Sequence, residues 1–415
     1  MTNQNMTTKT SDIRIASKEL PEKEFNSKIK SLHQSTNELS RYPVVIDEEY
    51  MNNAKKIGHI INSVVVMFAY NYTRDEKLQQ LYQLDQELNE IIKMAEGIPF
   101  ELGMYRLNFL YDSNGQPRIS EVNCQDPTKN WFLSADLSQI TNELAGKINK
   151  DWSGIEDQSE FITELENLFE QDEVLYIVKK EKKSEKETLL NELTNKGINV
   201  AYVQPEDFSV VNGDLKIGTV PARQFFLEMS AEELKSFDAE VLQKIIQSGR
   251  CINDVRSIIL VHNKKLMAGL FNPNIMGSYI NSEDFEFLKS YLIPSFVLNG
   301  QADIDYLNNS QDNWRLKNSS SRDGEGMYVR SNYSPEDWNQ LLLENWQDFL
   351  VQPVIQQKEF QLSIDHENTP VNLIGMELYF NAKSYGSGFF RASKEINTLD
   401  YKDILKLPCI VEKIS

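Results

Sequence analysis

Cysteine and histidine are scarce in this sequence. The 415 residues include three cysteines, which are odd in number and far apart: Cys124, Cys251 and Cys409. This spacing does not favour a disulfide framework and is typical of free thiols in a reducing, cytoplasmic compartment. The four histidines are also scattered, and no two of them stand at metal-ligand spacing. The sequence therefore predicts neither a disulfide-stabilised fold nor a zinc site.

Long apolar runs are also absent. The most apolar stretch, residues 60–70, is interrupted by Asn62 and is much shorter than the roughly 20 residues that a membrane-spanning helix needs. Residues 1–23 are polar and of mixed charge, without the apolar core of a signal peptide. We expect a cytoplasmic protein with no membrane partner, in which residues 1–20 form a disordered arm.

Positive charge is in deficit. Lysine and arginine number 43 against 62 aspartate and glutamate residues, so the net charge is −19. We do not expect nucleic acid as a partner of such a chain, because its phosphates require a cationic face. The same charge would tolerate a cationic substrate such as a polyamine, although it is also ordinary for an acidic cytosolic protein.

The remaining composition permits a packed interior, since 40% of residues are hydrophobic and 25% are charged. Apolar residues recur at helical spacing within 22–98, and 131–172 is also predicted to be helical. Residues 105–123 alternate as two strands around a turn at 112–115, which predicts a hairpin. Residues 174–203 predict a β-α-β unit, and the apolar run 255–261 predicts another strand. From 313 onward the pattern is mainly of strands.

The predicted hairpin carries the first candidate site. Glu121 and Asn123 lie two apart on one strand and therefore point to one face, as do Arg106 and Asn108 on the facing strand. If the register aligns them, all four side chains share a face. Carboxylate and carboxamide oxygens are hard ligands of the kind that Mg²⁺ prefers. A merely solvated strand face is the alternative interpretation.

A second candidate is the segment 314–329, where a strand ends at Lys317 and a loop carries Asp323, Gly324 and Gly326. Backbone amides of such a loop can bind phosphate oxygens, with the lysine adding a point charge. The order strand–lysine–loop–strand excludes a Walker P-loop, which continues into a helix. A glycine-rich hairpin loop without function would look the same.

Three weaker candidates follow. Pro353 interrupts the apolar strand 349–355, which indicates a sheet edge or a chain crossover where unpaired backbone groups could contact a base. Arg391 lies among apolar neighbours in 373–393, where it could bind a phosphate or form a structural ion pair. Lys264 and Lys265 follow the predicted strand 255–261, and we expect one of them to be only a surface charge.

Taken in order, these segments resemble the synthetase part of glutathionylspermidine and trypanothione synthetases and, more distantly, eukaryotic glutathione synthetase. The stretch from Arg106 to Thr128 is similar to the family's Arg-x-Asp-Phe, turn, Glu-x-Asn and Pro-Thr pattern, and Arg322-Asp-Gly324 is similar to its Arg-Glu-Gly. The likeness spans roughly residues 100–400. It implies a circularly permuted ATP-grasp fold of mixed α/β class, with a pre-ATP-grasp β-α-β subdomain and an N-terminal helical region.

The resemblance also implies a division of the chain and roles for its residues. The expected parts are the arm 1–20, an N-terminal helical region 21–100, a first part of the ATP-grasp core with the hairpin 101–165, an α/β subdomain 166–255 and a nucleotide-binding region 256–415. Mg²⁺ would be held by Glu121, Asn123, Asp323 and Asn108. ATP would be bound by Lys264, Lys317, Asp323, Gly324, Gly326, Gln352 and Val354. Arg106 and Arg391 would be the catalytic residues that stabilise the transferred phosphoryl group.

The activity that the resemblance implies is ADP-forming ligation of a carboxylate to an amine through an acyl phosphate. Small-molecule acid and amine substrates are expected, namely an amino acid, a peptide or a polyamine, and a homodimer is the default assembly. Asn108 departs from the family, which has a metal-binding aspartate at this position. An ATP-grasp protein that binds nucleotide without ligase activity is therefore the alternative function, and a kinase is a third.

Overall fold

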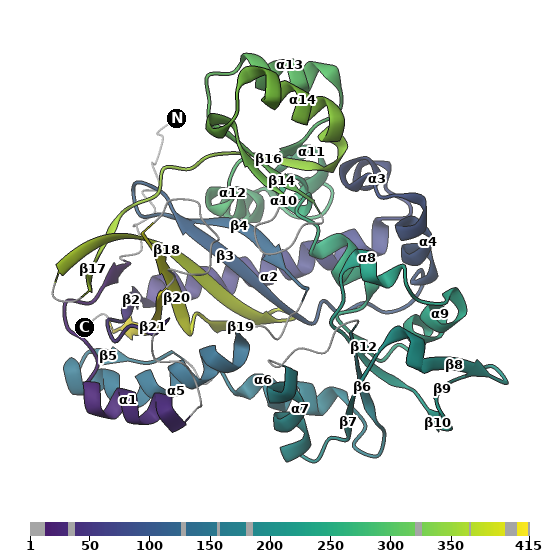
Figure 1. Ribbon diagram of the computed structural model, residues 1–415, viewed down its shortest axis with the longest axis horizontal. Coiled ribbons are helices and arrows are strands. Elements are labelled where there is room, and N and C mark those ends of the chain that lie inside the picture. Colours follow the sequence, from purple (N-terminus) through teal and green to yellow (C-terminus); the bar gives the residue numbers. More distant parts are fainter. Residues whose placement is uncertain are drawn as a thin grey trace.

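The computed structural model describes residues 13–31, 38–125, 130–155, 158–179, 186–319, 326–364, 367–394 and 405–413. Figure 1 shows a large central sheet flanked by helices, a small lobe above it and a separate parallel sheet to one side. The predicted mixed α/β class is confirmed by this arrangement. Within the described residues, no helix is both long and apolar enough to cross a membrane.

The central sheet is mainly antiparallel, with the strand order β1-β2-β21-β20-β18-β3-β4. Its strands along this path are β1 (Arg14–Ile15), β2 (Val44–Asp47), β3 (Met104–Tyr111), β4 (Pro117–Asn123), β18 (Glu367–Phe380), β20 (Phe389–Ser393) and β21 (Leu405–Glu412). Three further strands, β5 (Trp152–Ser153), β17 (Phe360–Ile364) and β19 (Lys383–Gly386), pair with β21 or β18. The hairpin β3–β4 is therefore confirmed, and it forms one edge of this sheet.

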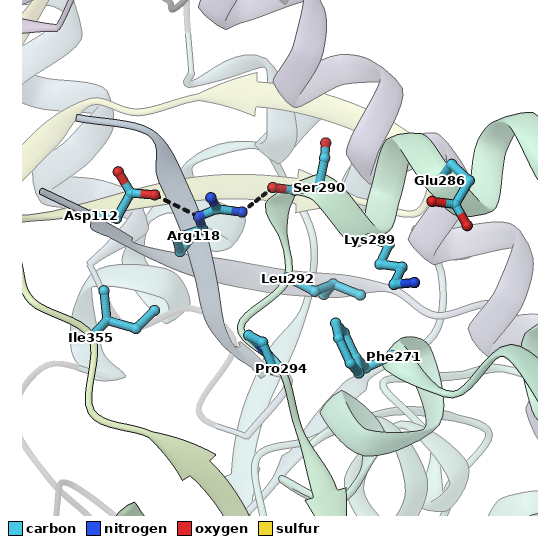
Figure 2. Close-up of a pocket in the computed structure, with 9 residues that line it drawn as sticks. All are labelled: Asp112, Arg118, Phe271, Glu286, Lys289, Ser290, Leu292, Pro294 and Ile355. Atoms are coloured by element: carbon cyan, nitrogen blue, oxygen red, sulfur yellow. Dashed lines mark hydrogen bonds and ion pairs between the residues drawn. The ribbon is translucent and has the colours of Figure 1, made fainter. Parts of the chain in front are cut away.

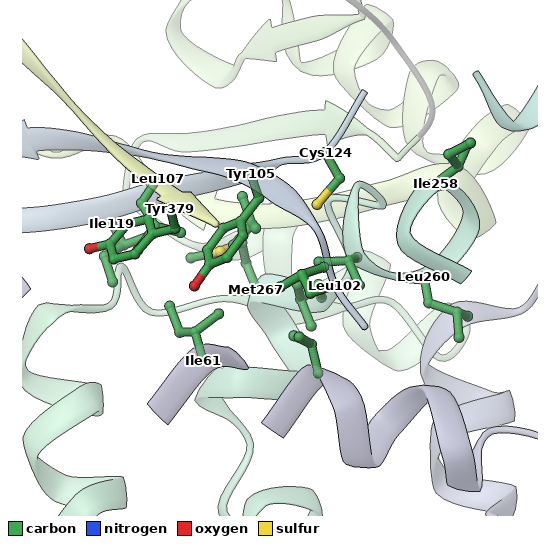
Figure 3. Close-up of a cluster of buried hydrophobic side chains, with 14 of the residues drawn as sticks. Ile61, Leu102, Tyr105, Leu107, Ile119, Cys124, Ile258, Leu260, Met267 and Tyr379 are labelled. Atoms are coloured by element: carbon green, nitrogen blue, oxygen red, sulfur yellow. The ribbon is translucent and has the colours of Figure 1, made fainter. Parts of the chain in front are cut away.

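Helix α2 (Glu48–Asn71) covers one face of the sheet and carries much of the core. Figure 3 shows Tyr105, Leu107 and Tyr379 of the sheet directed toward Ile61 of this helix. The contact is close, since a Cβ at Gly58 would lie 2.1 Å from the ring of Tyr379. Because side chains alternate along β3, Arg106 and Asn108 point to the opposite face.

The opposite face is only partly covered by helices. Helix α5 (Trp131–Ile148) packs there, and its Trp131 and Leu137 share a buried cluster with Met104 and Met376 of the sheet. Further helices before the parallel sheet are α1 (Glu22–Ser31), α3 (Glu76–Tyr82), α4 (Gln86–Met94) and α6 (Glu160–Leu168). The polar hairpin side chains lie on the remainder of this face, where Lys317 of the small lobe contacts the carbonyl of Ser120.

Two expectations for the N-terminal region need correction. The segment 22–98 is not wholly helical, because Val44–Asp47 forms β2 and pairs in parallel with β21. Residues 13–20 do not belong to a disordered arm, since β1 pairs with β2 and Leu20 is fully buried. The rest of the expected arm, residues 1–12, lies outside the described residues.

The separate sheet is parallel, with the order β12-β11-β6-β7. Its elements are β6 (Leu175–Val178), α7 (Lys186–Asn195), β7 (Val200–Val203), β11 (Gln224–Leu227) and β12 (Cys251–Ile252), flanked by α8 (Ala231–Leu234) and α9 (Ala239–Gln247). The predicted β-α-β unit is confirmed by the pairing of β6 with β7. A three-stranded antiparallel arm, β8 (Phe208–Val211), β9 (Asp214–Ile217) and β10 (Val220–Pro221), turns at Asn212 and Gly213 with φ of 55° and 83°.

The prediction of a strand at 255–261 is wrong, because Ser257–Val261 is helical and fully buried. A short apolar run does not by itself distinguish a buried strand from a buried helix. Local polar contacts favour the helix here. Arg256 is 2% exposed and donates hydrogen bonds to the carbonyls of Ile98 and Pro99, and the Ser257 hydroxyl donates to the carbonyl of Leu102.

The small lobe is an antiparallel sheet of order β13-β16-β14-β15 with helices on one face. Its elements are β13 (Phe296–Val297), α13 (Gln301–Asn309), β14 (Trp314–Asn318), β15 (Met327–Val329), α14 (Pro335–Asn345) and β16 (Phe349–Pro353), and α10 (Leu266–Phe271), α11 (Pro273–Met276) and α12 (Ser282–Tyr291) precede it. Trp314 and Leu316 pack into the core of the lobe with Trp338. Alternation along β14 therefore places Arg315 and Lys317 on the other face.

The strand at 349–355 does not lie at a sheet edge, because β16 lies between β13 and β14. Pro353 is tolerated because it is the last residue of β16. On the β13 side, the pairing involves only Leu350 and Val351. The missing amide of Pro353 therefore removes no hydrogen bond from that ladder.

Candidate functional site

The β3–β4 hairpin aligns four polar side chains on one face. Arg106 pairs with Asn123 and Asn108 pairs with Glu121, as the sequence predicts if the register is right. A register shift follows, so that Ser120 is an extra residue in β4. Such a bulge bends a strand and re-aims the neighbouring side chain, which here is Glu121.

The carboxylate of Glu121 is held by the two amides beside it. The side-chain nitrogens of Asn108 and Asn123 donate to the same carboxylate oxygen, Oε1, at 2.6 and 3.0 Å. The second oxygen, Oε2, receives neither bond. The Oδ1 oxygen of Asn108 is buried and has no hydrogen-bond partner within the described residues. Oδ1 of Asn108 is thus available, within the described residues, to accept a further ligand beside the Glu121 carboxylate.

Two lysines from other elements act electrostatically on Glu121. Lys317 of β14 is 4% exposed, and its ammonium donates to the carbonyl of Ser120 at 3.1 Å. Lys264 precedes α10, and its ammonium donates to the carbonyl of Asn318 at 3.1 Å. Glu121 therefore faces positive charge from the small lobe and from the segment before α10, which are far apart in the sequence.

These charges determine the protonation state of the site. Burial alone would raise the pKa of Glu121, but the ammonium groups of Lys317 and Lys264 and the two amides lower that pKa to about 2. Burial lowers the pKa of Lys317 to about 7, with Glu121 opposing the shift and Arg315 and Lys264 adding to it. Glu121 is thus a half-buried, ionised carboxylate, and the pKa of Lys317 lies near neutral pH.

The two adjacent lysines have different environments. Lys265 is 3% exposed, and its ammonium donates to the carbonyl of Tyr82 at 2.9 Å, away from Glu121. Burial lowers the pKa of Lys265 to about 8. Of the two, only Lys264 belongs to the Glu121 cluster. Lys265 is not the surface charge that we expected for one of them, because it lies inside the fold.

The two predicted catalytic arginines lie on the same face of the central sheet as Glu121. Arg106 is 8% exposed and neighbours Met376. Arg391 of β20 pairs with Ile374 of β18, and alternation places both on the Asn108 face, about 10 Å across the sheet from β3. No ion pair of Arg391 with a carboxylate is found within the described residues, and its Nε atom is buried without a hydrogen bond there. The alternative of a structural ion pair therefore finds no support in the described chain.

The predicted base-binding strand is more fully hydrogen-bonded than expected. The side chain of Gln352 donates to the hydroxyl of Ser295 at 2.8 Å, and the amide of Val354 donates to the carbonyl of Asn313 at 2.8 Å. The expectation of unpaired backbone groups is thus wrong for the amide of Val354, which pairs with the chain just before β14. The Gln352 position nevertheless lies beside Arg315 on the face that carries Lys317.

Part of the predicted phosphate loop can be placed. Gly326 has φ of 66°, and its carbonyl accepts the amide of Asn318 at 2.8 Å, which closes the base of the loop. Asp323 and Gly324 lie outside the described residues. Within the described residues, no three His, Cys, Asp or Glu side chains form a metal-binding group, so a metal here would depend on one carboxylate and amide oxygens.

Sequence reasoning missed Arg315. This residue is 8% exposed and lies two positions before Lys317 on the same face of β14, and burial lowers its pKa. The alternation that identifies Lys317 as an inward-facing residue applies equally to Arg315. An arginine between Trp314 and Leu316 was therefore a detectable signal.

Comparisons with known proteins cover only part of this site. Residues 57–260 match the family model described as the AnkG N-terminal domain. The match covers just under half of the chain, and it includes the β3–β4 hairpin but ends before Lys264 and Lys317. A search of curated proteins found no match.

Among solved structures, the chain is similar to a RimK domain protein, ATP-grasp, from Sphaerobacter thermophilus DSM 20745. The identity is 12% and the TM-score 0.31, over 57% of this chain and 90% of that one. ATP-grasp is also the fold that the sequence predicts. These values are too low to assign a function to this chain.

Proposed function

We propose that this chain is an ATP-dependent ligase of the ATP-grasp type, joining a carboxylate to an amine with release of ADP. The observation that carries the proposal is the half-buried, ionised Glu121, whose pKa is lowered by the nearby ammonium groups of Lys317 and Lys264. A carboxylate next to two ammonium groups suits a metal–triphosphate, because the acid can hold the cation while the lysines bind phosphate oxygens.

The residues present fit Mg²⁺. Oε2 of Glu121 receives no hydrogen bond from the side chain of Asn108 or Asn123, and Oδ1 of Asn108 has no hydrogen-bond partner within the described residues. Both are hard oxygen atoms, and rotation of the Asn123 amide would supply a third. When bound, Mg²⁺ would neutralise part of the phosphate charge and fix the orientation of the nucleotide. The buried oxygen of Asn108 would thereby gain the partner that it lacks within the described residues.

The nucleotide would lie between the inner face of the small lobe and the uncovered face of the central sheet. Lys317 and Lys264 would bind its phosphates, and the chain at Gln352–Val354 would lie along the base. A nearby phosphate would favour the protonated form of Lys317 and raise its pKa from about 7. Asp323, Gly324 and Gly326 would complete the phosphate site, as the resemblance implies.

Arg106 and Arg391 would serve the transferred phosphoryl group. A substrate carboxylate would attack the γ-phosphorus to give an acyl phosphate and ADP, and the amine would then displace phosphate to form the amide. Such chemistry needs positioning and charge neutralisation more than a protein nucleophile. We propose an amino acid, peptide or polyamine as substrate in a cytoplasmic homodimer related to glutathionylspermidine synthetase, and the net charge of −19 suits a cationic amine.

The test is an ADP-release screen of acid and amine pairs, with mass spectrometry of the products. Glu121→Ala and Lys317→Ala are each expected to abolish substrate-stimulated ADP release. Lys147→Ala is the matched control, because it removes an exposed charge that pairs with Glu24 on another face. Undiminished turnover in both site variants would rule out ligation at this site.

A specific observation favours a second candidate, nucleotide binding without catalysis. Asn108 stands where the resembled family has a metal-binding aspartate, and its amide nitrogen donates to Glu121 at 2.6 Å. The site thus has one negative charge fewer for its metal. Calorimetric ATP binding with no ADP formed across a broad substrate panel would favour this candidate, and ADP formation with a phosphorylated acid but no amide would indicate a kinase.

A further inference from the structure

A cavity of about 470 Å³ opens beside the turn end of the β3–β4 hairpin. Figure 2 shows it between the hairpin, the end of α12 and the end of α10. Its lining includes none of Glu121, Lys264 or Lys317, so it is separate from the candidate nucleotide site. The volume falls within the range of pockets that hold small molecules.

The cavity lies at the base of the small lobe. Leu292 and Pro294 belong to the segment that leads into β13, and Ile355 follows β16. Both chain connections between the small lobe and the rest of the protein therefore line it. Together with Phe271 of α10, these residues give the cavity an apolar wall (Figure 2).

The polar side of the cavity carries two charges of opposite sign. Glu286 and Lys289 lie three residues apart on α12, which places them on one face of the helix. Within the described residues neither forms an ion pair. The ammonium of Lys289 lies 5.7 Å from the ring centroid of Phe271, above the apolar wall.

The other two charged residues of the lining have partners already. Arg118 donates to Asp112 at 2.9 Å and to the carbonyl of Ser290, as Figure 2 shows. These contacts hold the hairpin turn against the end of α12. Arg118 and Asp112 therefore act as part of the wall, and Glu286 and Lys289 remain to contact a ligand.

We propose that this cavity binds a free α-amino acid with a hydrocarbon side chain. Residues three apart on a helix have Cβ atoms about 5–6 Å apart, so their charged ends can reach the adjacent ammonium and carboxylate of one amino acid. Lys289 binds the carboxylate, Glu286 binds the ammonium, and the side chain packs against Phe271, Leu292, Pro294 and Ile355. The site does not depend on the proposed ligase activity.

Calorimetric titration of the full chain with L-phenylalanine tests this proposal. Two matched probes each lack one charge: N-acetyl-L-phenylalanine has no ammonium, and L-phenylalaninamide has no carboxylate. Binding of L-phenylalanine is expected, with each analogue bound about tenfold more weakly because one charge-assisted contact is lost. Absence of binding at millimolar concentration, or equal binding of all three compounds, would overturn the proposal.

Variants then locate the site. Lys289→Gln and Glu286→Gln are each expected to weaken L-phenylalanine binding by about tenfold. Lys56→Gln is the matched control. Lys56 of α2 lies 4.3 Å from the ring centroid of Phe287 of α12, but it does not line the cavity. This variant is expected to bind L-phenylalanine as the wild type does. Arg391→Ala alters the candidate active site but not the lining of the cavity, so it distinguishes binding at the two places. Binding lost in Arg391→Ala but retained in Lys289→Gln would contradict the assignment.

Discussion

The two faces of strand β3 differ in what their side chains do. On one face, Tyr105 stacks on Tyr379 with ring centroids 4.9 Å apart, and Leu107 is fully buried against the α2 side. On the other, Arg106 and Asn108 are also nearly buried, but Arg106 contacts the sulfur of Met376 and Asn108 donates a hydrogen bond to the carboxylate of Glu121. Burial alone therefore does not distinguish core from site. On β3, the site face differs from the core face in carrying buried polar side chains, among them Asn108, whose Oδ1 has no hydrogen-bond partner within the described residues.

The largest effect on stability is expected from the apolar face. Leu107→Ala leaves a cavity beneath the sheet and should lower the free energy of unfolding by about 2–5 kcal/mol. Chemical denaturation measures this loss. The ATP affinity of the folded variant should stay close to that of the wild type. An unchanged free energy of unfolding in Leu107→Ala would contradict the structural role of this face.

The largest effect on function is expected from the polar face. Glu121→Gln keeps the shape of the side chain but removes the charge that opposes Lys317 and Lys264. We expect Mg²⁺-dependent ATP binding to weaken by about 100-fold, on the scale of losing a buried charge partner. Titration calorimetry measures the affinity, and the denaturation midpoint serves as the folding control. An unchanged affinity would show that Glu121 is only structural.

A smaller effect tests the departure at position 108. Asn108→Asp restores the acid of the resembled family and removes the hydrogen bond donated to Glu121. Two carboxylates side by side repel without a cation, so the variant should be less stable without metal and should bind Mg²⁺–ATP about tenfold more tightly. Thermal melts with and without Mg²⁺ measure both changes. A melt that Mg²⁺ does not shift would argue against a metal at this position.

The smallest effect concerns pH. The pKa of Lys317 in the folded protein is about 7, below its ordinary value, so the unfolded chain binds one more proton between these two values. Stability should therefore rise as pH increases from about 7 toward the ordinary lysine pKa, and Lys317→Met should flatten that rise. ATP affinity should change in the opposite sense and fall as Lys317 deprotonates. Titration calorimetry about one pH unit below and above the folded-state pKa of Lys317 measures the change in ATP affinity.

Much of the polar face could be predicted from the sequence because strand alternation is a strict geometric rule. It placed Arg106, Asn108, Glu121 and Asn123 together, and it would equally have identified Arg315. The rule does not determine which short apolar runs are strands. The run 255–261 became a helix because Arg256 and Ser257 bind carbonyls of the 98–102 segment, which only the folded chain brings near.

Long-range contacts were equally beyond sequence reasoning. The two lysines 264 and 265 are identical in type, and only the tertiary structure sends Lys264 toward Asn318 and Lys265 toward Tyr82. The bulge at Ser120 depends on the pairing of β3 with β4 and supplies the carbonyl that Lys317 contacts. The charge state of Glu121 follows from these contacts and could not be predicted without them.

The most direct test of the nucleotide site is calorimetric titration of ATP with and without Mg²⁺ into the wild type, Glu121→Ala and Lys317→Ala. We predict Mg²⁺-dependent binding to the wild type and loss of that binding in both variants, with their folding intact by circular dichroism. A wild type that does not bind ATP, or two variants that bind it as tightly as the wild type, would contradict the central claim.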